Sequence, residues 1–546
     1  MRRIILILAL CVAPILANAQ MLQAIMGSVA SSPPAPVFDA FPSLAPSAYC
    51  GVVKMRSAYA GNALQLALGA TPAATLNVGW VTNARGVQVA DDAAVQTWLA
   101  ANGNDFARVA VCYDQSGNGL DYTAPTPLTY PGPPLYKGVT KTGLPAGQSY
   151  APPLAEWLGL PSMNFYARNT IAGVRSFLNI NASITTNRQA ASLMMALSLN
   201  DSRPTGVVQA GQWLAWLGSA EFIFGNTGGT LQFSDGATLI NSTVAPAVDW
   251  SVKGFTASGS QVCAYDDITS ACQTNTYVSH AQSGGTIGAD DFAGTTYTFD
   301  GNVTAILGPW SIALTPTQYG QVRDGLKAQL NISATPTAQI VFDGDSITEG
   351  YFGAFSEHHA QRAIARIYND TGKRVRAYNV GIGARCIGAA GGSCPATTLT
   401  SEFVTKTQPL FSLGSYTTRI LLLQAGINDI VEGGATGAAT SGLLTTYIGN
   451  ARSAVAGIKV VFGGIASATS APFDAVCYTA MQAILAATQY DGLSGWYNDA
   501  NMKCQSGGGT NFSNTLYYSG DNVHPNGNGH DVGSGYDATA LESLLP

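Results

Sequence analysis

The sequence predicts two regions of different fold class: an antiparallel β-sandwich followed by an α/β domain built on a parallel sheet. Residues 38–330 contain short alternating apolar runs between Gly, Pro, Asn and Thr, a pattern typical of antiparallel sandwiches. Residues 340–546 contain apolar strand segments without polar alternation, and helical segments separate them. This second pattern indicates a parallel sheet that is covered on both faces.

The chain begins with the pattern of a secretory signal peptide. Arg2 and Arg3 precede an apolar core, and Ala17-Asn18-Ala19 forms a small-residue cleavage site. We therefore expect residues 1–19 to be a signal peptide, cleaved before Gln20, and the protein to be secreted or periplasmic. No other segment reaches the length of a membrane span, so we expect no membrane anchor.

The composition argues against several classes of partner and cofactor. The net charge is −6 and only 11% of the residues are charged, so the chain is not expected to bind nucleic acid. It has no P-loop and no G-x-G-x-x-G motif after a strand, so no nucleotide cofactor is implied. No His/Cys cluster has the spacing of a metal site, and we expect no metal and no other cofactor. The sequence leaves the oligomeric state open.

Two connecting segments divide the chain. Residues 20–37 are expected to link the signal peptide to the sandwich. A second stretch, "NISATPTAQ" at residues 331–339, is small and polar and lies between a helical segment and an apolar strand. We expect the domain boundary within this second stretch, because more than five hundred residues exceed what one core normally organises.

Runs such as "RVAVCYDQ", "ASLMMALSL" and "EFIFGNTGGTLQFSDG" are the expected strands of the sandwich. The phrases "KMRSAYAGNALQL" and "CYDQSGNGLDYT" resemble the catalytic domain of family 54 arabinofuranosidases and the wider concanavalin A-like jelly-roll group. The segment "FDGNVTAILGPWSIALTPTQYGQVRDGLKAQL" resembles the final strand and short helix of laminin-G-like lectin folds. The resemblance implies a jelly-roll sandwich.

Glycoside hydrolysis by this region would need two carboxylates at a fixed separation. Only two glutamates precede residue 330, Glu156 and Glu221, and neither stands in a context that matches the arabinofuranosidase nucleophile. We therefore favour a carbohydrate-binding or spacer role. Aromatic residues such as Tyr59, Trp213 and Trp216 stack on sugars in one interpretation and fill the sandwich core in the other, more frequent one.

Three short blocks in the second region carry the residue types of acyl-transfer chemistry. Ser346 ends the apolar strand segment "IVFDGDS", Asn428 follows the strand segment "LLLQAG", and Asp521 and His524 lie in "DNVHP". Ligands bind beyond the carboxyl ends of parallel strands, where Ser346 and Asn428 both fall. A nucleophile, an amide donor and an Asp/His pair are the groups needed to attack an acyl carbon.

These blocks resemble those of the SGNH or GDSL hydrolases, which are esterases and lipases on a flavodoxin-like three-layer α/β/α fold. The resemblance implies that Ser346 is the nucleophile, that His524 is the general base and that Asp521 orients the imidazole. It also implies an oxyanion hole made by the Ser346 N–H, the Asn428 amide and one further backbone N–H.

That further N–H follows the strand segment "KRVRAYNVGIGARC". Spacing from Asn379 puts the family's glycine at Ala384, with Gly383 just before it. An alanine N–H donates as well as a glycine N–H unless the turn needs a positive φ. Gly383 and Ala384 therefore both remain candidates.

Each site residue also has a structural interpretation. Asn428 followed by Asp429 would cap a helix, and Asp521 with His524 would form a surface ion pair. We interpret Asp345 and Asp429 as structural hydrogen-bonding residues. The remaining histidines are expected outside the site: solvated on a helix for His358 and His359, and at the start of the last helix for His530.

The cysteines predict disulfides. Without Cys11, which lies in the signal peptide, eight remain: Cys50, Cys112, Cys263, Cys272, Cys386, Cys394, Cys477 and Cys504. Eight cysteines permit 105 connectivities. Proximity along the chain favours Cys263–Cys272 and Cys386–Cys394, which leaves Cys50 for Cys112 and Cys477 for Cys504.

The leading hypothesis is a secreted serine esterase that removes acyl groups, acetyl first among them, from a plant or bacterial polysaccharide or a small ester. The second is a carbohydrate-binding protein or an arabinofuranosidase-type glycosidase that acts through the N-terminal region. A third, a lipase, needs an apolar acyl groove that the sequence does not show.

Overall fold

The computed structural model describes residues 32–68, 74–103, 106–125, 134–138, 160–165, 176–187, 190–199, 212–217, 223–227, 230–234, 239–267, 269–274, 281–289, 299, 301–350, 359–388, 392–487, 489–519 and 521–546. The predicted signal peptide, most of the first linker, Glu156, Glu221 and His358 lie outside the described residues. The side chains of Trp213 and His359 lie outside them as well.

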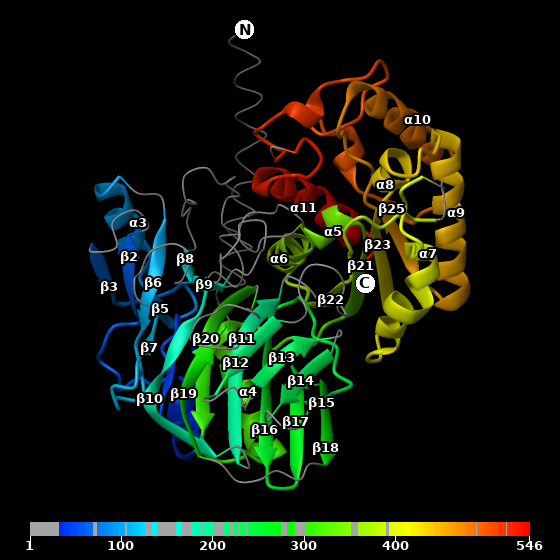
Figure 1. Ribbon diagram of the computed structural model, residues 1–546. Coiled ribbons are helices and arrows are strands. Elements are labelled where there is room, and N and C mark those ends of the chain that lie inside the picture. Colours follow the sequence, from blue (N-terminus) through cyan, green and yellow to red (C-terminus); the bar gives the residue numbers. More distant parts are fainter. Residues whose placement is uncertain are drawn as a thin grey trace, which may run out of the picture.

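The N-terminal region is an antiparallel β-sandwich, as its alternating pattern predicts (Figure 1). One layer follows the pairing order β18 (Thr269–Thr274), β17 (Gln261–Asp266), β16 (Ser251–Ser258), β11 (Ala191–Leu199) and β20 (Gly301–Trp310). The far edge of β20 pairs with β1 (Tyr49–Gly51) and β9 (Ser162–Phe165), and β9 pairs with β8 (Leu135–Lys137).

The second layer follows the order β15 (Leu239–Asn241), β14 (Thr230–Ser234), β13 (Ile223–Thr227), β12 (Gln212–Trp216), β19 (Ala281–Ile287), β10 (Leu178–Asn187) and β7 (Tyr122–Thr123). From β7 the pairing continues to β6 (Ala107–Cys112), β2 (Leu64–Leu68) and β3 (Thr75–Val78). A small separate pair joins β4 (Trp80–Thr82) and β5 (Gln88–Ala90).

The two layers enclose an apolar core. The rings of Phe233 on β14 and Phe255 on β16 lie 5.3 Å apart across it. Trp216 is only 4% exposed, so it is a core residue and not a sugar-stacking one. Tyr59 is partly exposed and lies edge-on to Trp80, with 6.4 Å between ring centroids.

Few helices accompany the sandwich in the described part of the chain. They are α2 (Val37–Ala40), a short helical turn (Pro42–Leu44), α3 (Asp92–Ala101) and α4 (Pro316–Leu330). The carboxylate of Asp91 caps α3 by accepting the Ala94 N–H at 3.1 Å. Helix α4 ends at Asn331, whose φ of 65° stops it where the second linker was predicted to begin.

The C-terminal region is a parallel sheet with helices on both faces (Figure 1). Its strands lie in the order β22 (Val375–Asn379), β21 (Ala338–Gly344), β23 (Thr418–Gln424), β24 (Lys459–Phe462) and β25 (Gly492–Leu493). This is the flavodoxin-like strand order 2-1-3-4-5. Strand β21 begins at Ala338, so the last two residues of the predicted linker belong to the strand.

Alternate side chains of the buried strands feed the two cores on either side of the sheet. Ile340 and Phe342 pack with residues of α6 (His359–Thr371) and α11 (Gly527–Glu542). Val341 packs in the other core, which includes residues of α9 (Gly437–Ala454) and α10 (Ala471–Ala487). Shorter helical segments lie between these elements: α5 (Ser346–Glu349), α7 (Leu399–Glu402), Phe403–Thr407, Gln408–Ser412, α8 (Ile427–Val431), Gly495–Asn498 and Asn511–Ser513.

The sandwich covers the open edge of the parallel sheet. Strand β22 is an edge strand, and its Ala377 carbonyl accepts a hydrogen bond of 2.8 Å from the N–H of Val248, a sandwich residue. The Ala377 N–H donates to the Asp249 carboxylate at 3.1 Å. An unpaired sheet edge exposes N–H and C=O groups that promote aggregation, and here the sandwich forms hydrogen bonds with some of those groups.

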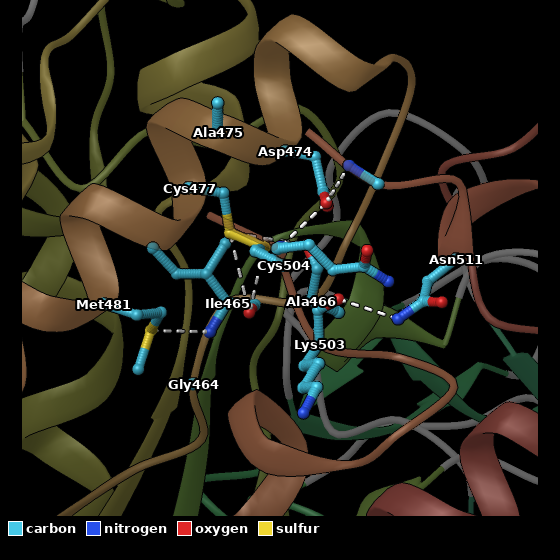
Figure 2. Close-up of a disulfide and its surroundings, with 12 residues drawn as sticks. Gly464, Ile465, Ala466, Asp474, Ala475, Cys477, Met481, Lys503, Cys504 and Asn511 are labelled. Carbon is cyan, nitrogen blue, oxygen red and sulfur yellow. Dashed lines mark hydrogen bonds between the residues drawn. A yellow bond between two sulfur atoms is a disulfide. The ribbon is translucent and has the colours of Figure 1, made fainter. Parts of the chain in front are cut away.

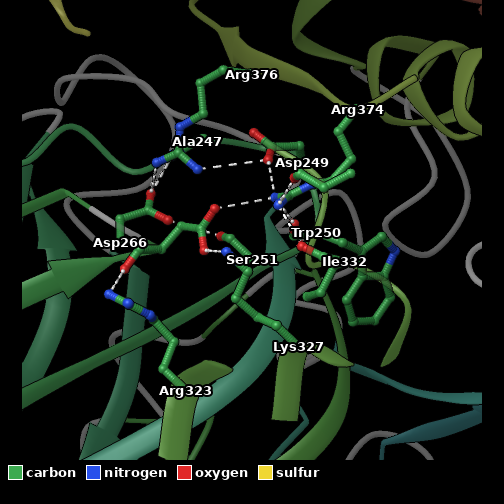
Figure 3. Close-up of polar contacts among 12 residues, drawn as sticks. Ala247, Asp249, Trp250, Ser251, Asp266, Arg323, Lys327, Ile332, Arg374 and Arg376 are labelled. Carbon is green, nitrogen blue, oxygen red and sulfur yellow. Dashed lines mark hydrogen bonds and ion pairs between the residues drawn. The ribbon is translucent and has the colours of Figure 1, made fainter. Parts of the chain in front are cut away.

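A buried ion network extends this contact (Figure 3). Arg376 pairs with Asp266 at 2.8 Å, and Arg374 pairs with Asp249 at 3.4 Å. Lys253 reaches Asp266 from within the sandwich at 2.7 Å. Burial alone would raise the pKa of Asp266, but Arg376 and Lys253 hold it at about 2. The two regions are therefore joined by buried ion pairs, and removing either partner of a pair would leave the other as an uncompensated buried charge.

Among the described helices, none combines the length and the apolar character needed to cross a membrane.

Candidate active site

Ser346 lies at the first position of α5, directly after β21. Gly344 makes this tight exit possible, because its φ is 155° and a Cβ atom there would lie 2.0 Å from the Gln424 carbonyl oxygen. The Asp345 carboxylate caps α5 by accepting the Ile347 N–H at 3.0 Å. Asp345 thus has the structural role expected from the sequence, and burial raises its pKa to about 7.

Three predicted residues from distant parts of the chain form a continuous hydrogen-bonded row. His524 Nε2 lies 2.8 Å from Ser346 Oγ, and His524 Nδ1 lies 2.6 Å from Asp521 Oδ2. The Ser519 hydroxyl and the backbone N–H groups of Val523 and His524 also donate to Asp521. Burial alone would raise the pKa of Asp521, but these hydrogen bonds hold it well below its usual range.

This electrostatic arrangement fixes the tautomer of His524. An ionised Asp521 carboxylate only accepts hydrogen bonds, so Nδ1 carries the proton that it receives. The lone pair of neutral His524 is then on Nε2, which faces Ser346 Oγ. The arrangement is able to accept the Ser346 proton.

The loop that carries Asp521 and His524 is held by backbone hydrogen bonds. The Ser519 N–H donates to the His524 carbonyl at 2.9 Å, and the Thr469 N–H donates to the Asn522 carbonyl at 2.8 Å. Asn522 adopts a φ of 58°, a left-handed conformation that asparagine tolerates better than most residues.

The segment before this loop is fixed to α10 by a disulfide (Figure 2). Cys477 of α10 bonds to Cys504, and the nearby Asp474 carboxylate accepts the N–H groups of Gln505 and Gly509, each at 2.8 Å. Asn511 adds a hydrogen bond of 2.9 Å to the Lys503 carbonyl. The disulfide therefore limits the movement of the chain that leads to His524.

The other cysteines also pair as predicted, two pairs from proximity along the chain and one from the cysteines that remained. Cys50–Cys112 joins β1 to β6, Cys263–Cys272 crosses the β17–β18 hairpin, and Cys386–Cys394 closes the segment after β22.

Asn428 does not cap the helix that contains it. The cap position of α8 is Gly426, with a φ of 117° and no side-chain hydrogen bond. The Asn428 amide donates instead to the Arg385 carbonyl at 3.0 Å, in the turn after β22. This geometry removes the capping interpretation of Asn428 and leaves its second amide proton for another acceptor.

Asp429 ties α8 to the same turn. Its carboxylate accepts the N–H of Ile387 at 2.9 Å and that of Gly388 at 3.3 Å, the structural role expected for it. The Arg385 guanidinium binds Glu402 at 2.9 Å. The turn after β22 is therefore fixed from two sides.

The turn itself distinguishes the two backbone candidates. The Gly383 N–H donates to Glu349 Oε2 at 2.5 Å, so it is already used. Ala384 has a φ of 61°, the left-handed conformation in which glycine is favoured. A Cβ atom at Gly383 would lie 3.8 Å from Ser346 Cβ, so this turn is next to the nucleophile position.

Glu349 is a site residue that sequence reasoning missed. It is only 3% exposed and lies one helical turn after Ser346. The one available signal was a carboxylate within the "GDSITEG" segment, but nothing in the sequence indicated that it reaches the turn after β22.

His530 is buried in the first turn of α11, close to the position expected for it. In the described part of the chain, no group of three or more His, Cys, Asp or Glu residues has the arrangement of a metal site.

Comparison with solved structures gives weak overall likenesses. An arabinofuranosidase complexed with arabinofuranosyl-α-1,2-xylobiose is 13% identical with a TM-score of 0.36, covering 54% of this chain and 65% of its own. A family two carbohydrate esterase from Clostridium thermocellum in complex with cellohexaose is 12% identical with a TM-score of 0.30, covering 75% and 98%. A carbohydrate acetylesterase from Sinorhizobium meliloti is 13% identical with a TM-score of 0.26, covering 38% and 100%.

This chain thus spans only 65% of the length of the arabinofuranosidase. At these identities and TM-scores, the likenesses carry no argument about activity or substrate. A comparison with curated proteins found no match.

A family model gives a direct assignment for the second region. The model of the GDSL-like Lipase/Acylhydrolase family matches residues 342–532, which include β21, the Asn428 segment and the loop with Asp521 and His524. The C-terminal region of this chain therefore matches the GDSL-like Lipase/Acylhydrolase family over residues 342–532.

Proposed function

We propose that this protein is a secreted serine esterase that hydrolyses ester bonds on a polysaccharide, O-acetyl groups first among them, through an acyl-enzyme on Ser346. The observation that carries the proposal is the hydrogen-bonded row from Ser346 Oγ to His524 and from His524 to Asp521, with distances of 2.8 and 2.6 Å. Such a row lets a neutral hydroxyl act as a nucleophile near neutral pH.

In the first half-reaction, Ser346 Oγ attacks the ester carbonyl carbon while His524 Nε2 takes its proton. The resulting imidazolium is stabilised by Asp521, which remains ionised. His524 then gives the proton to the leaving alcohol of the sugar, and the acyl group stays on Ser346.

In the second half-reaction, water attacks the acyl-enzyme. His524 Nε2 takes a proton from the water, the acid leaves, and Ser346 Oγ regains its proton. Each half-reaction builds a negative charge on the former carbonyl oxygen. Backbone N–H groups beside Ser346 and the free proton of the Asn428 amide are the proposed donors to that oxygen.

The support for a carbohydrate substrate comes from the sandwich. Its phrases resemble carbohydrate-active jelly rolls, and its segment around Val248 pairs with the edge strand β22, next to the turn at Gly383. A polymer bound to the sandwich would be held at a fixed distance from Ser346, because buried ion pairs join the two regions. We propose boundaries of 38–330 for the sandwich and 340–546 for the esterase domain.

The support for secretion is the signal-like N-terminus together with four disulfides, which form and persist in oxidising compartments. Analysis of the N-terminus of the exported protein tests this part. Cleavage before Gln20 is expected, and retention of an intact leader in the cytoplasm would contradict it.

The test of function uses p-nitrophenyl esters of increasing chain length beside acetylated xylan. Wild type is compared with Ser346→Ala and with Ser453→Ala, a matched substitution of an exposed serine on α9. We expect preference for acetyl esters, acetate release from xylan, and loss of both only in Ser346→Ala. Activity that rises toward long chains would favour a lipase, and sugar release without acetate would favour a glycosidase.

A further inference from the structure

Glu349 occupies an unusual place for a carboxylate. It is 3% exposed, one helical turn after the proposed nucleophile, and its Oε2 accepts the Gly383 N–H at 2.5 Å. A buried carboxylate is costly unless hydrogen bonds compensate it. The proposed triad does not use this group, so its position needs another explanation.

The backbone N–H groups of the turn supply that explanation. The four before Ala384 are used: Val380 donates to Phe342 O at 2.9 Å, Gly381 to Asn379 Oδ1 at 3.1 Å, Ile382 to Gly344 O at 3.0 Å and Gly383 to Glu349 Oε2 at 2.5 Å. Within the described residues the Ala384 N–H has no hydrogen-bond partner. Ala384 is exposed, so its N–H is open to solvent and to an incoming acceptor.

We infer that Glu349 is a positioning residue that selects the Ala384 N–H as the backbone donor to the oxyanion. By accepting the Gly383 N–H, Glu349 fixes the Ile382–Gly383 peptide and leaves the next N–H along the chain, that of Ala384, for another acceptor. Ala384 itself has a left-handed conformation, with a φ of 61°. This inference rests on the proposed acyl-enzyme mechanism.

Packing supports the same assignment. A Cβ atom at Gly381 would lie 2.5 Å from the Glu349 backbone N, so the turn is pressed directly onto α5. On its far side, the turn is held by the hydrogen bond from Asn428 to the Arg385 carbonyl at 3.0 Å. Glu349 and Asn428 thus hold the Ile382–Gly383 and Arg385–Cys386 peptide units, which lie before and after Ala384.

The test compares Glu349→Ala with Glu349→Gln in the full chain, using p-nitrophenyl acetate and the melting temperature. Glu349→Ala removes the acceptor, and a misplaced donor is expected to lower kcat by about 10²-fold with little change in KM. Glu349→Gln keeps an oxygen for the Gly383 N–H and is expected to restore most of the lost kcat. A merely structural role would lower the melting temperature and leave kcat of the folded protein unchanged.

A matched control is Asp343→Asn, which alters another buried carboxyl group of the same strand–helix unit. Asp343 accepts from the hydroxyls of Thr407 at 2.6 Å and Tyr447 at 2.5 Å and from the Gly344 N–H at 2.8 Å, and none of these partners lies in the turn after β22. It is expected to change the melting temperature without changing kcat. If Glu349→Ala does not fold, Glu349→Asp replaces it, since the shorter side chain retracts its oxygen and is expected to lower kcat below that of Glu349→Gln.

Labelling by a fluorophosphonate separates this inference from the proposed function. Wild type that is labelled, with Glu349→Ala labelled more slowly and Glu349→Gln at close to the wild-type rate, supports the positioning role. Wild type and Glu349→Ala labelled at equal rates, or Glu349→Gln as impaired as Glu349→Ala, overturns it. Wild type that is not labelled at all contradicts the proposed nucleophile itself.

Discussion

Substitution of Asn428 separates transition-state stabilisation from structural support in a single variant. Two losses are expected in Asn428→Ala, because the amide has two protons and only one donates to the Arg385 carbonyl, at 3.0 Å. Losing the bond to Arg385 costs about 1 kcal/mol of stability. Losing a donor to the oxyanion costs about 3 kcal/mol of activation free energy, a factor on the order of 10²–10³ in kcat.

The assay is kcat and KM with p-nitrophenyl acetate, together with the melting temperature. We expect kcat to fall by that factor with KM nearly unchanged, and the melting temperature to fall by about 2–4 °C. Asn428→Asp is the isosteric comparison: it lacks the donor and adds a negative charge, so it should be at least as slow. A normal kcat in Asn428→Ala beside a lowered melting temperature would refute the oxyanion role.

Three further predictions concern stability. Asp249→Ala removes a carboxylate from the buried arginines Arg374 and Arg376 and is expected to lower the free energy of unfolding by on the order of 3 kcal/mol, measured by denaturant unfolding. An unchanged free energy of unfolding would show that these ion pairs do not stabilise the protein. Burial raises the pKa of Asp345 from 3.8 to about 7, so its contribution to stability is fully present below pH 3.8 and is lost as the pH rises through 7. The melting temperature of Asp345→Asn, which keeps the cap, should therefore rise relative to that of the wild type from pH 5 to pH 8. An equal difference in melting temperature at the two pH values would contradict the raised pKa. Ala384→Gly should raise the melting temperature, because a left-handed alanine costs about 1–2 kcal/mol, and a lowered one would argue against strain there.

Local sequence patterns predicted the architecture well where one rule dominated. The apolar segments "IVFDGDS" and "RILLLQAG" contain strands β21 and β23, since a strand covered on both faces tolerates such continuous burial. The sandwich pattern was equally direct. The relation between the two regions was not predictable, because pairing between Val248 and Ala377 depends on tertiary contact between residues more than a hundred positions apart.

The candidate site was predicted to the extent that each residue has its own signal. Ser346, Asp521 and His524 each follow a recognisable segment, and the structure brings their side chains into hydrogen-bond contact. The turn after β22 was left open between Gly383 and Ala384, since the choice depends on Glu349, whose role arises only when α5 and the turn are packed together. A hydrogen bond from a side chain to a distant turn leaves no periodic pattern in the sequence, so it could not be predicted.

The central claim is that Ser346 is the nucleophile of an esterase. The most direct measurement is tandem mass spectrometry of the protein after reaction with a fluorophosphonate or after acid quench during p-nitrophenyl acetate turnover. We expect one modified residue, Ser346, in the wild type. In Ser346→Ala the corresponding peptide should remain unmodified, and in His524→Ala Ser346 should be modified more slowly than in the wild type. Turnover of the ester with Ser346 unmodified, or a label on another residue, would contradict it.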